Sequence, residues 1–288
     1  MTDSTTGQTE LRKEYIDGAV KAVALAEYKL KTLCTIDSSN AWIETYYREN
    51  NSELTGSTGS STKGIPRLAP FPYNEVTETK VQSYILKYGM EGVISYEDAT
   101  KNNIPMIQRT LLRIGRAVTY AIDVEIEAQM SANAGNSVTI SAGYEWNSAT
   151  IAQRDPVKDI LDAIQTMRAD NLNALNGNGY LVLNGNSYTD LMGNSKIVNS
   201  PTFKSADVVT NGVVGQICGL KIMVTEAVTA DTAYVVIAQE AMTWKEAHAL
   251  QVLQIEDPGI KTTIRAYEMG VCQITAPNAI CKISNTRA

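Results

Sequence analysis

The sequence predicts an α+β fold in which one domain is interrupted by another, and three observations predict it. An apolar stripe with a spacing near 3.6 residues runs through residues 95–130, which indicates a long helix. The last fifty residues have mostly the pattern of strands and include no helix to cover them, so we expect them to pack on the long helix. Residues 151–239 mix helical and strand patterns, and we expect an inserted compact domain there.

The composition of the chain is that of a globular protein. The chain has 288 residues, of which 44% are hydrophobic and 19% charged, so it is large enough for one large or two modest globular domains. No segment approaches the roughly 18 uninterrupted apolar residues of a membrane helix. The first residues lack the basic start and apolar run of a secretory signal, so we expect synthesis in the cytoplasm and no membrane contact. A net charge of -6 predicts that any contact with nucleic acid is weak and local.

The N-terminal third is predicted to be extended. Residues 1–64 are interpreted as an arm, with an amphipathic helix over 11–33 that can dock on a neighbouring molecule and a Gly/Ser/Thr-rich linker over 52–64. Residues 65–97 begin with three prolines in seven positions and continue with a polar, alternating strand over 80–88. Adjacent sequence offers this strand few core partners, so we expect an extended loop that leaves the domain body.

The long helix carries charges on the face opposite its apolar stripe. The stripe consists of Ile107, Leu111, Ile114, Val118 and Ile122. Opposite it lie Arg109, Arg113 and Arg116, which are interpreted as intersubunit ion-pair residues, with nucleic acid inside a shell as the alternative partner.

Three carboxylates crowd the C-terminal end of the same helix. Asp123, Glu125 and Glu127 occupy a place where the helix dipole disfavours negative charge, so we expect a compensating group from outside the helix. Asp123 and Glu127 share one face, which favours a solvated or subunit-contacting helix end. A pair of catalytic carboxylates is the alternative.

The remaining elements have clear local signals. Asp155 as N-cap and Pro156 at the first helical position predict a helix that stops near 176–177. A strand at 180–183, a helix at 187–192 and strands at 220–224 and 233–238 follow. The end of the chain reads as strands at 250–255, 262–274 and 279–283, with a turn at 257–259.

No residue pattern predicts an enzyme, a metal site or a cofactor. His248 is the only histidine, so catalytic triads and zinc sites of several histidines would all depend on it, and no zinc spacing surrounds it. The four cysteines lack a CxxC pair and are expected to be reduced, mostly buried thiols. The segment at 56–64 lacks the residue order of a phosphate loop. We therefore expect a structural protein, with a carboxylate-dependent hydrolase as the less favoured class.

The order of elements resembles a known family. EGVISYEDATKNN leading into RTLLRIGRAVTYAIDVEIEAQM, then YLVLNGNSYTDLMG, GQICGLKIMVTEAV and TAYVVIAQEAMTW, and finally IKTTIRAYEMGVCQITAPNAICKI are similar to successive parts of the major capsid proteins of tailed viruses, whether of bacteria or archaea. These proteins share the Hong Kong 97-like fold with encapsulins. The resemblance covers about residues 65–285 and rests on element order and residue class, because none of the stretches is an invariant signature.

The resemblance implies a domain plan. The N-terminal arm and linker would occupy 1–64, the extended loop 65–97, the peripheral domain with its spine helix 98–150 and 240–288, and the axial domain 151–239.

The resemblance also implies a function. Copies would form pentamers and hexamers of an icosahedral virion shell around double-stranded DNA, with scaffold, portal and decoration proteins as further partners. The expected contact residues between subunits are Lys80, Tyr84, Lys87, Arg109, Arg113, Arg116, Asp123 and Glu127. An encapsulin-type compartment is the alternative, and the long polar arm and linker disfavour it.

Overall fold

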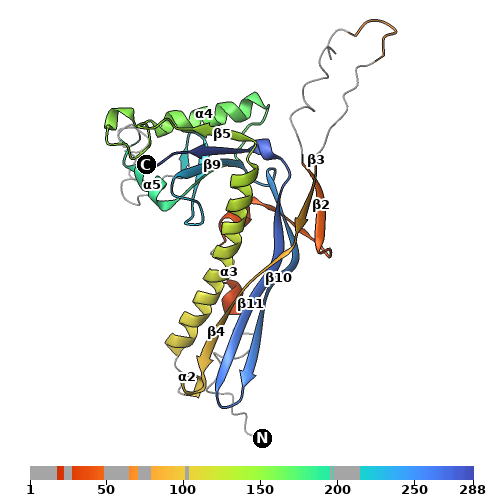
Figure 1. Ribbon diagram of the computed structural model, residues 1–288, viewed down its shortest axis with the longest axis vertical. Helices are drawn as coiled ribbons and strands as arrows, with labels where there is room; N and C mark the ends of the chain where they lie inside the picture. The colour runs from red at the N-terminus through yellow and green to blue at the C-terminus, as the bar shows by residue number, and fades with distance from the viewer. Residues whose placement is uncertain are drawn as a thin grey trace.

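A computed structural model describes residues 18–22, 28–48, 65–70, 79–100, 104–194, 197 and 215–288. The chain forms an elongated unit of one long helix on a sheet, a second unit of helices around another sheet, and a two-stranded ribbon (Figure 1). The linker predicted at 52–64 and residues 11–17 and 23–27 of the helix predicted at 11–33 lie outside the described residues.

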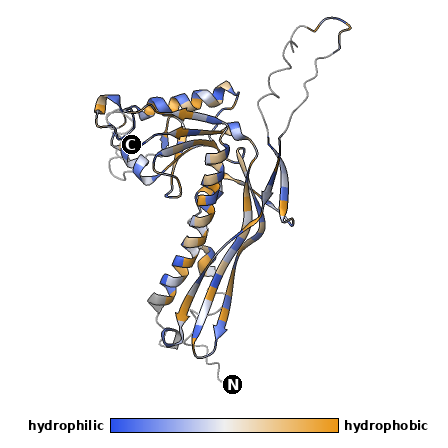
Figure 2. Cartoon of the chain, in the orientation of Figure 1, coloured by the Kyte–Doolittle hydropathy of each residue, from blue (hydrophilic) through white to orange (hydrophobic). Residues whose placement is uncertain are grey.

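The elongated unit is built on a four-stranded sheet. Its strands lie in the order β1 (Thr35–Ser38), β10 (Met242–Asp257), β11 (Lys261–Ile274) and β4 (Leu86–Ser95). The strands β10 and β11 form a long antiparallel hairpin, and its turn contains Gly259 at a φ of +76°, a conformation that glycine adopts without strain. Figure 2 shows hydrophilic and hydrophobic residues interspersed along these strands, as expected for a sheet with one covered face.

The long helix covers that sheet as predicted. The predicted range contains two helices, the short α2 (Tyr96–Thr100) and the 30-residue α3 (Ile104–Asn133), and α3 is the one with the predicted stripe. The whole predicted apolar stripe is buried, and it continues through Ile126 and Met130. A Cβ atom at Gly92 of β4 would lie 2.6 Å from Ile114 Cδ1, so glycine permits the close approach of strand and helix.

The second unit is built on a six-stranded sheet. Its strand order is β5 (Asn136–Thr139), β12 (Ile280–Ser284), β9 (Thr232–Ile237), β6 (Gly179–Leu183), β8 (Leu220–Val224) and β7 (Gln216–Ile217). Helices α4 (Pro156–Ala169) and α5 (Gly185–Met192) accompany this sheet. The predicted strands and the short helix are confirmed, and so is the N-cap, because the Asp155 side chain accepts a hydrogen bond from the Lys158 N–H. The helix α4 ends at Ala169, before the predicted stop, and Asn171 at a φ of 61° redirects the chain.

One predicted strand belongs to a different sheet from the one expected. The strand predicted at 279–283 exists as β12, but the expectation that it packs under the long helix is wrong. Its residues pair with β9 on one side and with β5 on the other. Because β5 precedes residue 151 and β12 follows residue 239, the six-stranded sheet extends beyond the boundaries predicted for the inserted domain.

The N-terminal segment is part of the core. After a helical turn at 18–22, residues 28–38 form a 3-10 helix (Leu30–Leu33) and strand β1, which pairs in parallel with β10. Leu30 and Leu33 are almost fully buried. The prediction of one helix to residue 33 that docks on a neighbour is therefore wrong for residues 28–33, since their apolar side chains are covered by the same chain.

The predicted loop at 65–97 divides into two parts. Strand β3 (Thr79–Tyr84) pairs with β2 (Ile43–Arg48) in the two-stranded ribbon, away from both larger sheets (Figure 1). Strand β4 instead pairs with β11 along its whole length, so the expectation that residues 86–95 leave the domain body is wrong. The same pairing supplies the core partners that adjacent sequence lacks.

Candidate assembly surfaces

The ribbon of β2 and β3 exposes large apolar side chains. Tyr84 is 62% exposed and Tyr47 56%, Ile43 is also exposed, and Trp42, immediately before β2, is 73% exposed. A two-stranded ribbon is at best marginally stable alone in water, and apolar side chains that gather on a protruding element mark an interaction surface. The Gln273 amide donates to Ser83 Oγ at 2.9 Å and fastens the base of the ribbon to β11. The ribbon therefore presents a surface that needs a partner.

Three of the predicted contact residues come from the predicted extended loop at 65–97. Two of these three lie on the ribbon and the third does not. Lys80 is exposed and is paired across the strands with Tyr47, while Tyr84 is paired with Ile43. Lys87 lies on β4, and its Nζ is 4.4 Å from the centre of the Tyr267 ring. The sequence placed all three on one extended loop, but the structure divides them between the ribbon and the four-stranded sheet.

The face of the four-stranded sheet turned away from α3 carries polar and charged pairs. Ile264 and Ala266 are buried under the helix, so the alternation of β11 directs Arg265 and Tyr267 to the other side. There the Arg265 guanidinium binds the Glu91 carboxylate across the strands at 2.5 Å. Both side chains of this pair are exposed, so it contributes little stability and leaves the face open to solvent.

The three arginines predicted as contact residues lie together on α3. Arg109, Arg113 and Arg116 are all exposed, on the side of the helix opposite the buried stripe. In Figure 2 the lower half of α3 shows hydrophilic positions among hydrophobic ones. The helix thus presents a basic surface to the outside of the chain.

Asp123 is not at a solvated helix end. The side chain is only 3% exposed, and its carboxylate accepts hydrogen bonds from the backbone N–H groups of Lys29, at 3.0 Å, and Lys31, at 3.3 Å. The predicted compensating group is thereby confirmed, because it comes from the N-terminal segment. Burial raises the pKa of Asp123 to about 6, although these hydrogen bonds favour the charged form.

Glu127 is likewise buried, and it lies against the six-stranded sheet. Its Oε1 accepts a hydrogen bond of 2.8 Å from the Tyr234 hydroxyl on β9. Burial and this carboxylate both raise the pKa of Tyr234. The expectation of a solvated or subunit-contacting helix end is therefore wrong for Asp123 and Glu127, which instead join α3 to two other parts of the same chain.

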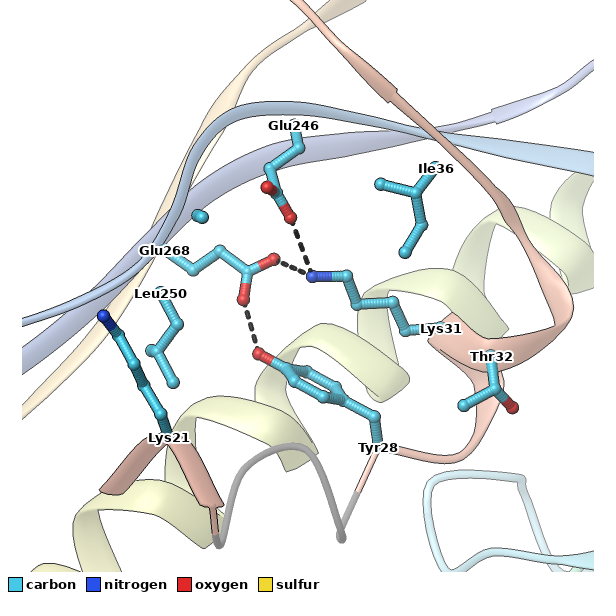
Figure 3. A pocket seen from close by; sticks show the side chains of 9 residues that line it. Lys21, Tyr28, Lys31, Thr32, Ile36, Glu246, Leu250 and Glu268 are labelled. Carbon is cyan, nitrogen blue, oxygen red and sulfur yellow. Dashed lines mark hydrogen bonds and ion pairs between the residues drawn. The ribbon is translucent and has the colours of Figure 1, made fainter. Parts of the chain in front are cut away.

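Sequence reasoning missed a buried ionic cluster under the N-terminal segment (Figure 3). Lys31 Nζ donates to Glu268 at 2.5 Å and to Glu246 at 3.0 Å, while the Tyr28 hydroxyl donates to the other oxygen of Glu268. Glu268 is fully buried, and burial raises the pKa of Tyr28. One signal was available: Glu268 follows Ile264 and Ala266 in the inward alternation of its strand, which predicts a buried carboxylate.

A cavity of about 400 Å³ opens beside this cluster. Its lining residues are Lys21, Tyr28, Lys31, Thr32, Ile36, Glu246, Ala249, Leu250 and Glu268. Lys31 of the N-terminal segment forms ion pairs with Glu246 on β10 and Glu268 on β11. The cluster therefore holds the N-terminal segment on the sheet.

A second cavity, of about 540 Å³, lies between β5 and the start of α4. Asp155, Asp159 and Asp162 line it, but each has a role within the chain. Asp155 caps α4, Asp159 accepts a hydrogen bond of 2.9 Å from the Trp146 indole, and Asp162 pairs with Lys158. Burial raises the pKa of Asp159, and the nearby Asp155 carboxylate adds to the shift.

The residue types weighed as catalytic or metal-binding groups can now be placed. They include no group of three or more histidine, cysteine or acidic side chains placed to hold a metal ion. His248 is exposed on β10, and three of the four cysteines are buried as expected. In the described ranges, no helix combines the length and the apolar character required to cross a bilayer.

A long helix on a sheet, a second mixed unit and a protruding apolar ribbon define a structural protein that acts through its surfaces. A family model of phage capsid proteins matches residues 78–283, more than half of the chain. The chain belongs to the phage capsid protein family and is a structural major capsid protein.

Solved structures show the same fold. A virus-like particle from Pyrococcus furiosus matches with a TM-score of 0.65 at 11% identity, over 95% of this chain and 100% of that one. The capsid of cyanophage P-SCSP1u gives 0.66 at 15% identity, over 89% and 88%. The mature capsid of bacteriophage PhiM1 gives 0.62 at 12% identity, over 91% and 88%. The predicted Hong Kong 97-like fold is thereby confirmed. A comparison with curated protein sequences gives no match.

Proposed function

We propose that many copies of this chain assemble into pentamers and hexamers of an icosahedral shell that encloses viral double-stranded DNA. The ribbon of β2 and β3 carries the proposal, because its apolar side chains have no cover within the described part of the chain. A neighbouring copy would cover them. Shell closure then follows from repeated contacts between unlike surfaces, each with the same rotation.

The domain plan is revised accordingly. The extended loop is the ribbon itself, the peripheral domain is the four-stranded sheet with α3, and the axial domain is the six-stranded sheet, whose loops would meet at the symmetry axes. Lys80 and Tyr84 remain proposed contact residues on the ribbon, and Lys87 on the open face of the peripheral sheet. The protein would be made in the host cytoplasm and end in the virion, with scaffold, portal and decoration proteins as further partners.

Assembly of purified protein tests the proposal. Electron microscopy of the wild-type chain is expected to show closed particles. Tyr47→Ser combined with Tyr84→Ser removes two exposed rings from the ribbon, and we expect folded subunits without particles. Tyr120→Ser is the matched control, since Tyr120 is similarly exposed, at 54%, but lies on α3. Small monodisperse subunits of the wild type under every assembly condition would refute the proposal, and particles filled with a cargo enzyme in place of nucleic acid would favour the compartment alternative.

A further inference from the structure

The strand β5 forms an open edge of the six-stranded sheet. Among the described strands its only neighbour is β12 (Figure 1). The Ile140 N–H donates to the Ser284 carbonyl of β12 at 3.1 Å. Because the backbone groups of successive residues in a strand point alternately to its two sides, those of Ser137 and Thr139 point away from β12. A row of such backbone groups is a template for a further strand.

This edge lacks the common protection against a further strand. Natural edge strands often carry a charged side chain or a proline, which blocks pairing. The four residues of β5, NSVT, include neither, and both Ser137 and Thr139 are exposed. The cavity of about 540 Å³ lies directly beside the edge, because the consecutive residues 138–141 all line it. The edge therefore has room for an extended segment.

The opposite wall of this cavity is acidic. Asp155, Asp159 and Asp162 of the start of α4 line it together with Lys158, and three carboxylates and one ammonium give a net charge of -2. Their spacing of four and three residues places the aspartates on one stripe of the helix, about a third of a turn from its buried stripe. Burial and the neighbouring Asp155 raise the pKa of Asp159, and a cation in the cavity would relieve this cost.

We propose that the open edge of β5 binds an extended, basic polypeptide segment of a partner protein, which adds a strand to the sheet and directs lysine or arginine side chains toward Asp159 and Asp162. The inference goes beyond the proposed function and does not depend on shell assembly. Backbone hydrogen bonds to Ser137 and Thr139 would supply affinity, and the alternate side chains of the segment would supply specificity. At about 3.3 Å per residue, a segment of about four to six residues spans β5.

The charge of the cavity disfavours two other occupants. If the β5 edges of two copies paired, their acidic walls would come together, and like charges on paired strands are destabilising. The phosphate groups of a nucleic acid would be repelled in the same way, because binding to them requires lysine or arginine. A basic segment has the complementary charge.

Binding of synthetic peptides to unassembled subunits tests the inference. The probe is a peptide of about eight residues in which lysine and threonine alternate, long enough to span β5, and fluorescence anisotropy gives its Kd. One control peptide has glutamate in place of lysine. A second control keeps the lysines but has a methyl group on every backbone nitrogen, so it cannot donate hydrogen bonds to the edge. We expect both controls to bind at least about tenfold more weakly than the probe.

Variants of the chain test the two walls of the cavity separately. Thr139→Pro removes the outward N–H of β5 without removing a bond to β12. Asp162→Lys changes the net charge of the cavity from -2 to zero. Asp37→Lys is the matched control, because Asp37 and Asp162 are both exposed aspartates that pair with a lysine. We expect Thr139→Pro and Asp162→Lys each to weaken binding of the probe by about tenfold, and Asp37→Lys to leave the Kd unchanged.

Each other outcome overturns the inference or separates it from the proposed function. A probe that does not bind the wild type overturns it. Equal binding of the methylated peptide also overturns it, since charge alone would then explain the affinity, and this result holds even if Thr139→Pro does not fold. Wild-type dimers that Thr139→Pro abolishes would place a second copy on the edge in place of a basic partner. If the wild type binds the probe but forms no particles, the proposed function fails and this inference stands.

Discussion

The carboxylate of Asp123 on α3 accepts a hydrogen bond of 3.0 Å from the backbone N–H of Lys29. A second bond, from the N–H of Lys31, makes Asp123 the acceptor for the start of the 3-10 helix at residues 30–33. This contact joins segments that are more than ninety residues apart in the sequence. It holds the N-terminal segment on the spine helix, at the edge of the cavity beside the ionic cluster.

The buried Asp123 carboxyl predicts a specific pH dependence of stability. Its pKa is about 6 in the folded chain, against 3.8 for an unperturbed aspartate, so the folded state binds the proton more tightly. The contribution of Asp123 is therefore most favourable below about pH 4 and is lost as the pH rises through about 6. We expect the free energy of unfolding of the wild type, relative to Asp123→Asn, to rise by about 2 to 3 kcal/mol between pH 7 and pH 4.

Urea unfolding of unassembled subunits at several pH values measures this difference. The asparagine variant keeps an acceptor for the backbone N–H groups but cannot titrate, so it isolates the proton. A difference between the two proteins that stays constant from pH 7 to pH 4 would contradict the buried, titrating carboxyl.

The local pattern of the sequence predicted where helices and strands lie better than it predicted which distant segments they contact. The stripe on α3, the cap at Asp155 and the strands of the second unit follow from residue spacing, because each depends on neighbours within a few positions. The sheet to which β12 belongs depends on pairing with β9 and β5, across more than forty and more than one hundred and forty residues, and spacing carries no information about it. The prediction of a solvated helix end at Asp123 and Glu127 failed for the same reason, because their partners come from distant parts of the chain.

The ionic cluster predicts a large cost for removing its cation. In Lys31→Met, two carboxylates remain in a largely buried site without a counter-charge, so we expect a loss of about 3 to 5 kcal/mol in the free energy of unfolding. Adding Glu268→Gln to Lys31→Met removes one of the two uncompensated charges and should restore part of the loss. Chemical denaturation of the two single variants and the double variant gives the coupling energy.

A surface ion pair provides the control for the cluster. Lys245 binds Asp37 between β10 and β1, and the Asp37 side chain is 55% exposed. We expect Lys245→Met to cost only a small fraction of the loss in Lys31→Met, because solvent screens this pair. Equal losses for Lys31→Met and Lys245→Met would mean that the cluster is not buried as described.

Close packing between Gly270 and Trp244 predicts that β11 does not tolerate a methyl group there. A Cβ atom at Gly270 would lie 2.6 Å from Trp244 Cζ2 and 2.8 Å from the Lys245 carbonyl oxygen. The Trp244 ring is fully buried. We expect Gly270→Ala to cost about 1 to 3 kcal/mol, seen as a lower Tm of the unassembled subunit.

Gly215→Ala is the matched substitution, since a Cβ atom there has no neighbour within 4 Å. Its Tm should equal that of the wild type or exceed it slightly, because alanine restricts the unfolded chain. If Gly270→Ala also unfolds at the wild-type temperature, the strand and the tryptophan are not in contact as described.

The hydrogen bond from Tyr234 to Glu127 connects the spine helix to the six-stranded sheet, so its loss should weaken the junction between the two units. Tyr234→Phe leaves a buried carboxylate without this donor, and we expect a cost of about 1 to 3 kcal/mol in urea unfolding. Tyr120→Phe, at an exposed position on the same helix, should have almost no effect. Replacing both partners, as in Tyr234→Phe/Glu127→Leu, removes the uncompensated charge and should recover stability relative to Tyr234→Phe alone. A double variant less stable than the sum of the two single changes would show that Glu127 acts through other contacts, and that this pair does not couple the two units.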